Sequence, residues 1–176
     1  MTKIIDLQSY RTIVLEKRIF GPWQKRFGET YGLKTRLSDL SNNAVYYLAQ
    51  PGEASSLAYY ELIMGVLDFG TASDFHYLSN EKKMAVVDIH LFLADQVRFE
   101  MMWRLKWVKA FEARKFGLME LVQNFKHIKT TCRKNPPELA ESNPDYLAYT
   151  KLTYEDKEVF IRRMLQKALE AFTEKI

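Results

Sequence analysis

Residues 80–112 constrain the fold most, because they follow the pattern of one long α-helix. The first half of this stretch, residues 84–94, is apolar on nearly every side, as in a helix that other helices surround. In the second half, Trp103, Trp107 and Phe111 recur every fourth residue, with basic residues between them. We therefore predict a long central helix that is buried at first and then emerges into a basic, aromatic face.

The remaining sequence predicts an all-α fold. Asn-Gly and Asp-Gly turns are absent, as are alternating runs of Val, Ile and Thr, so strands are not expected. With 176 residues, 47% of them hydrophobic, the chain has the size of one domain and can bury a core without disulfides. We predict a single helical bundle of five to seven helices over residues 1–176, with Leu91 and Phe92 in its core.

Proline and glycine mark the expected interruptions. Gly21-Pro22 is predicted to separate a first helix, residues 6–20, from a short second helix. The first of these has an amphipathic spacing of apolar residues at Leu7, Tyr10, Ile13 and Val14. Residues 133–150 contain three prolines and are predicted to form an irregular connector before the last helix.

Cysteine usage and hydropathy indicate a cytoplasmic protein. Cys132 is the only cysteine, which excludes an internal disulfide and fits a reducing compartment. The first residues lack the basic and apolar regions of a secretory signal. No apolar run approaches the roughly 20 residues that a membrane-spanning helix needs. We expect no membrane span.

Charge is segregated along the chain. Residues 1–36 carry eight Lys and Arg against three acids, and residues 101–134 carry nine against two. Residues 37–100 carry nine acids against three basic residues. The two basic segments can form one surface for a polyanion, or they can pack against the acidic middle of the same chain.

Five polar residues form the first candidate site, at Glu61, Asp68, Asp88, His90 and Asp95. Two pairs of these carboxylates are spaced by seven residues, so each pair follows one side of its predicted helix. Solvated or salt-bridged acids and a hydrogen-bonded core histidine are the simpler interpretation. The alternative is an enzyme or ligand site near Glu61, Asp88 and His90. The Glu-x-x-His pattern of di-iron bundles is absent, as are nucleophile and phosphate-loop motifs, so we predict no metal, no cofactor and no identifiable catalysis.

The second candidate is a basic and aromatic surface that follows residue 100. Packing in the core or at a subunit interface is the simpler interpretation of its aromatic side chains. Nucleic-acid binding over residues 101–134 is one alternative, although no known nucleic-acid-binding module is visible, and contact with a membrane surface is the other. The residues concerned are Trp103, Arg104, Lys106, Trp107, Lys109, Arg114 and Lys115.

These observations predict a protein-interaction or regulatory module that associates with itself or with another protein. High aromatic content, segregated charge and the missing catalytic motifs motivate this hypothesis. The nucleic-acid-binding protein and the helical-bundle enzyme remain the alternatives.

Overall fold

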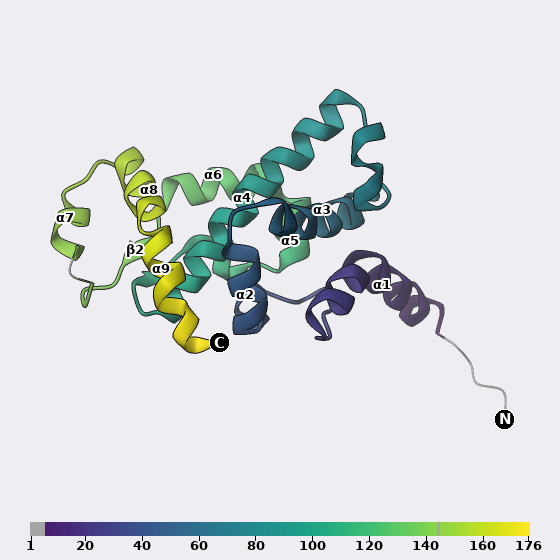
Figure 1. The fold of residues 1–176 in the computed structure, drawn as a ribbon. Helices are drawn as coiled ribbons and strands as arrows, with labels where there is room; N and C mark the ends of the chain where they lie inside the picture. The colour runs from purple at the N-terminus through teal and green to yellow at the C-terminus, as the bar shows by residue number, and fades with distance from the viewer. Residues whose placement is uncertain (1–5, 144) are drawn as a thin grey trace.

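The computed structural model describes residues 6–143 and 145–176 and confirms the all-α prediction (Figure 1). Nine α-helices lie in these residues, more than the five to seven expected, together with one two-stranded sheet. In the described part of the chain, no helix has the length and hydropathy to cross a bilayer. The α-helices are α1 (Leu7–Phe27), α2 (Asn42–Ala49), α3 (Glu53–Leu67), α4 (Asn80–Arg104), α5 (Leu118–Gln123), α6 (Phe125–Lys134), α7 (Tyr146–Thr150), α8 (Tyr154–Arg163) and α9 (Leu165–Phe172). The short 3-10 helices are η1 (Leu37–Asp39), η2 (Ala72–Tyr77), η3 (Glu112–Lys115) and η4 (Thr173–Lys175).

The core lies where α3 packs against α1, α2 and α4. Two large aromatic side chains at its centre have their polar atoms satisfied. Trp23 Nε1 donates to the Ala58 carbonyl at 2.7 Å, and the Tyr59 hydroxyl donates to the Leu48 carbonyl at 2.7 Å. Both side chains can therefore be buried without leaving an unpaired donor.

The predicted helix break at Gly21-Pro22 is wrong, because α1 continues through Pro22 to Phe27. Pro22 has no N–H to donate to the Arg18 carbonyl one turn earlier. Packing on α3 holds the helix together there: Arg18 Nε donates to the Gly65 carbonyl at 3.0 Å. Gly65 permits this close crossing, since a Cβ at that position would lie 3.1 Å from the Arg18 carbonyl oxygen.

The central helix also differs from its prediction, because α4 ends at Arg104 and does not reach residue 112. The Trp107 N–H donates to the Met102 carbonyl at 2.9 Å, and the Lys106 N–H donates to the Trp103 carbonyl at 3.0 Å. This pair of bonds is the Schellman motif that closes helices, with Lys106 in the left-handed position at φ 64°.

A two-stranded sheet follows in place of the helix's expected second half. Strand β1 (Val108–Ala110) pairs antiparallel with β2 (Glu138–Leu139), which lies inside the predicted irregular connector together with α7. The Tyr149 hydroxyl of α7 donates to the Pro137 carbonyl. The connector is thus attached to β1 through β2, and its own α7 is joined to the residue that precedes β2.

Burial along α4 differs from the expectation, because the first half is buried on one side only, at Val86, Ile89 and Leu93. Met84 and Leu91 in its first half are 67% and 58% exposed, so the prediction that Leu91 belongs to the core is wrong. Phe92 is buried, as predicted. The second half lies inside the fold, and its buried side chains are Gln96, Val97, Phe99, Glu100, Met101 and Met102.

Candidate functional site

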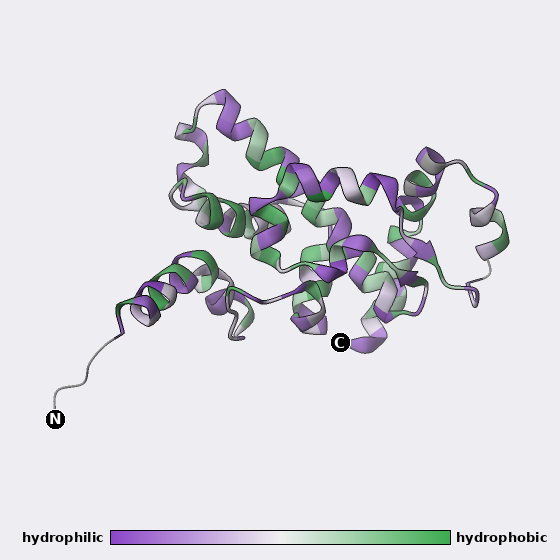
Figure 2. Cartoon of the chain, turned by 180° about the vertical axis from the view of Figure 1, so that it is seen from behind, coloured by the Kyte–Doolittle hydropathy of each residue, from purple (hydrophilic) through white to green (hydrophobic). Residues whose placement is uncertain are grey.

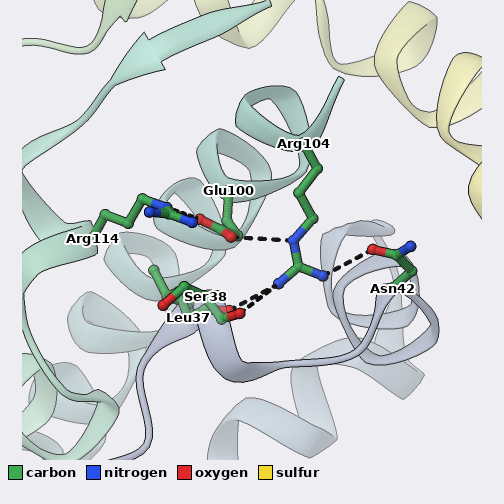
Figure 3. Close-up of polar contacts among 6 residues, drawn as sticks. All are labelled: Leu37, Ser38, Asn42, Glu100, Arg104 and Arg114. Carbon is green, nitrogen blue, oxygen red and sulfur yellow. Dashed lines mark hydrogen bonds and ion pairs between the residues drawn. The ribbon is translucent and has the colours of Figure 1, made fainter. Parts of the chain in front are cut away.

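A buried carboxylate organises the predicted basic segment (Figure 3). Glu100 on α4 is fully buried, and two arginines contact it from different elements. Arg104 Nε, one turn later on α4, lies 3.1 Å from Oε1, and Arg114 Nε on η3 lies 2.9 Å from Oε2. Each carboxylate oxygen therefore accepts a charge-assisted hydrogen bond, which offsets the cost of burying it.

Arg104 extends this network to the N-terminal part of the chain. Its Nη1 donates to Asn42 Oδ1 at 2.9 Å, and its Nη2 donates to the Leu37 carbonyl at 3.1 Å and the Ser38 carbonyl at 3.5 Å (Figure 3). The guanidinium thus joins α4 to α2 and η1. Its donors serve contacts within the chain, so Arg104 is placed to stabilise the fold.

The aromatic residues of the basic segment do not share one face. Arg114 lies over the Trp103 ring, 3.5 Å from its centre, which is a cation–π contact. Phe111 is buried against Phe99, and Trp107 borders a separate cavity of about 610 Å³ with Phe160. The stacked row of aromatics expected on one helix does not form, because the helix ends before Trp107.

The lysines of this segment also have separate surroundings. Lys106 occupies the turn that closes α4, and Lys109 is exposed on β1. Lys115 is exposed and pairs with Glu112 at 3.1 Å. The cations of the predicted surface therefore lie in separate surroundings.

The first two carboxylates of the polar candidate site are used in ion pairs. Glu61 Oε1 lies 2.6 Å from Arg26 Nη2, and this contact raises the pKa of the guanidinium. Asp68 lies in the left-handed position at the end of α3, where it pairs with Arg18 at 3.7 Å. Both pairs join α3 to α1, which indicates a structural role.

The other three polar residues lie around two different cavities. Asp88 is exposed and borders a cavity of about 220 Å³, whereas His90 borders another of about 410 Å³. Asp95 borders both and accepts a hydrogen bond from Arg162 at 2.7 Å. Because Asp88 and His90 leave α4 on different sides, the structure does not bring them together with Glu61.

His90 is packed between aromatic rings. Its imidazole centre lies 5.1 Å from that of Tyr59 and 5.4 Å from that of Tyr60. Burial lowers the pKa of the imidazole, and the positive charge of Arg98 lowers it further. Within residues 6–143 and 145–176, no three His, Cys, Asp or Glu side chains gather as a metal site requires.

The first half of α1 extends away from the other helices (Figure 1). Leu7, Tyr10, Ile13 and Val14 are 60%, 55%, 61% and 49% exposed. At 100° per residue these four side chains fall within an arc of about 120°, and we call this arc the α1 face. Figure 2 shows green, hydrophobic residues intermixed with purple, hydrophilic residues along this part of the helix.

Cations accompany the α1 face. Arg11 is exposed at its edge, and Lys17 is exposed within the arc, farther along the helix than Val14. A shallow hollow of about 310 Å³ lies along Tyr10, Arg11 and Val14. The sequence predicted the amphipathic spacing of this helix but not its exposure, because the spacing is the same whether the apolar side covers the chain's own core or another molecule.

Comparisons of this chain with protein families, with curated proteins and with solved structures found no match.

Proposed function

We propose that this chain is a protein-interaction module that associates with a second copy of itself through the α1 face. The supporting observation is the exposure of four large apolar side chains on one side of one helix. Single exposed apolar residues are ordinary, but a contiguous patch of them is typical of an interface. Such a module can regulate the activity of whatever it assembles with, and its single cysteine fits a cytoplasmic location.

The contacts of the two other candidate sites favour this function over the alternatives. Arg104 and Arg114 already pair with the buried Glu100, which leaves fewer free cations for a nucleic acid. Glu61 pairs with Arg26 and lines neither the cavity beside Asp88 nor the one beside His90, so a shared catalytic pocket has little support.

Light scattering coupled to gel filtration tests the proposal. We expect the average mass of the native protein to rise over a concentration series that reaches the hundred-micromolar range. The double variant Leu7→Gln, Val14→Gln should remain monomeric at every concentration, because both substitutions remove exposed apolar surface.

The matched control is the double variant Leu147→Gln, Val159→Gln, which also replaces two exposed apolar residues but lies on α7 and α8. It should associate like the native protein. A native protein that stays monomeric throughout, or an α1 variant that associates as strongly as the control, would contradict the proposal.

A further inference from the structure

A second exposed face lies on the first half of α4. Glu81, Met84, Asp88 and Leu91 are all exposed, and their spacing of three, four and three residues places them on one side of the helix. We call them the α4 face. Neither Glu81 nor Asp88 has an ion-pair partner within the described residues. This face therefore combines two apolar side chains with two acidic side chains, and Asp88 borders a cavity that Lys129 and Arg133 also line.

The α1 helix carries the complementary pattern. Leu7 and Val14 are seven residues apart, and so are Arg11 and Arg18, which lie along one edge of the α1 face. On the α4 face the apolar pair and the acidic pair are also seven residues apart. Seven residues span about 10.5 Å of helix, so the two faces match in length as well as in charge.

We infer that the α1 face of one copy packs antiparallel on the α4 face of a second copy. When α1 of one copy and α4 of the other lie side by side in this direction, Leu7 lies against Leu91 and Val14 lies against Met84. The same register places Arg11 beside Asp88, and it brings Arg18, which also pairs with Asp68 of its own chain, near Glu81. This inference rests on the proposed function, since it names the surface that the α1 face binds.

The charges beyond each face favour the antiparallel direction. Lys129 and Arg133 border the cavity next to Leu91, and antiparallel packing places Asp6 of the other copy near these two cations. Parallel packing would instead bring Arg18 to Asp95. That carboxylate is already paired with Arg98 and Arg162, whereas Asp88 has no such pair among the described residues, so another arginine gains less at Asp95.

Because the two faces differ, each contact leaves one α1 face and one α4 face free. Such a heterologous contact builds a ring when its rotation closes and an open chain when it does not. Each face presents only four main side chains, so the contact falls below the roughly 1,200 Å² of a standard stable interface. We therefore expect weak association in the micromolar range.

A mixing experiment tests the pairing. One variant carries Leu7→Gln and Val14→Gln, and the other carries Met84→Gln and Leu91→Gln. Each should be monomeric alone at concentrations where the native protein assembles. Mixed in equal amounts, they should form a one-to-one dimer that does not grow, because the intact α4 face of the first meets the intact α1 face of the second.

Several outcomes separate this inference from the proposed function. If the α4 variant alone still associates while the α1 variant does not, the α1 faces pair with each other or bind elsewhere, and only this inference is overturned. The same holds if both variants are monomeric and their mixture stays monomeric. A native protein that remains monomeric overturns both proposals.

A charge reversal examines the register independently. Arg11→Glu and Asp88→Arg should each weaken association at least about threefold, because each places like charges side by side. A chain that carries both substitutions should regain native association, since the pair is restored with reversed signs. Equal weakening in the combined chain would exclude contact between these two positions. All of these side chains are exposed, so an unchanged thermal midpoint checks that each variant folds.

Discussion

Glu100 and Arg114 are 14 residues apart in the sequence, yet the arginine Nε donates to the fully buried carboxylate at 2.9 Å. The chain between them leaves α4, forms the turn at Lys106 and continues through β1 to η3. The ion pair therefore holds η3 against α4.

Replacing Glu100 by Gln should lower the free energy of unfolding by about 3–5 kcal/mol, because the two arginines lose the charge that compensates them. Urea unfolding measures the change. The control is Glu112→Gln, whose lysine partner is exposed, and it should cost at most about 1 kcal/mol. Equal losses in the two variants would show that the buried network does not stabilise the fold.

Gly65→Ala should destabilise the crossing of α1 and α3 by about 1–3 kcal/mol. The new methyl group would lie 3.1 Å from two backbone atoms, the Arg18 carbonyl oxygen and the Ile19 Cα, which cannot rotate away. Gly21→Ala is the matched control, because its nearest neighbour is the flexible Lys17 side chain at 4.0 Å. That substitution should gain up to about 1 kcal/mol from helix propensity, and thermal unfolding distinguishes the two.

Adjacent residues on α4 should respond very differently to truncation. Phe92→Ala should cost about 3–5 kcal/mol, because the side chain is buried against Phe125. Leu91→Ala should change stability by less than about 0.5 kcal/mol, since Leu91 is exposed. Denaturant unfolding at low protein concentration keeps association from contributing. A large loss for Leu91→Ala would place that residue in the core after all.

His90 should make stability depend on pH in the mildly acidic range. Its pKa is lower in the folded chain than the value of about 6.5 expected when unfolded, so the unfolded state binds the proton more readily. This contribution is fully present above about pH 6.5, is lost as the pH falls below that value, and levels off once the folded imidazole is also protonated. Unfolding free energies between pH 7 and pH 5 should therefore fall less steeply for His90→Gln. Identical slopes for the two proteins would contradict the assignment.

The all-α fold could be predicted from the sequence, whereas the end of the central helix could not. The aromatic residues at positions 103, 107 and 111 keep a helical spacing, which favours one continuous helix. The position that closes α4 is Lys106, where helices usually have glycine. Without a glycine at that position, the helix propensities of the residues give no indication that α4 ends at Arg104.

In the candidate sites, too, contacts within one helix could be predicted from the sequence, whereas burial could not. Glu100 and Arg104 have the four-residue spacing of a helical ion pair, so their contact is readable from the sequence. Its burial is not, because burial depends on where the turn after α4 carries Arg114. Likewise, the sequence predicts that α1 is amphipathic, but only its placement on α3 leaves Leu7 and Val14 exposed.

Backbone hydrogen exchange, compared between dilute and concentrated solutions of the native protein, tests the α1 face most directly as a self-association surface. We predict that amides of residues 7–17 exchange more slowly in the concentrated sample, because association suppresses local opening of this helix. Amides of residues 146–163, which lie outside both faces, should exchange at the same rate in the two samples. Equal exchange of residues 7–17 at both concentrations would contradict the account.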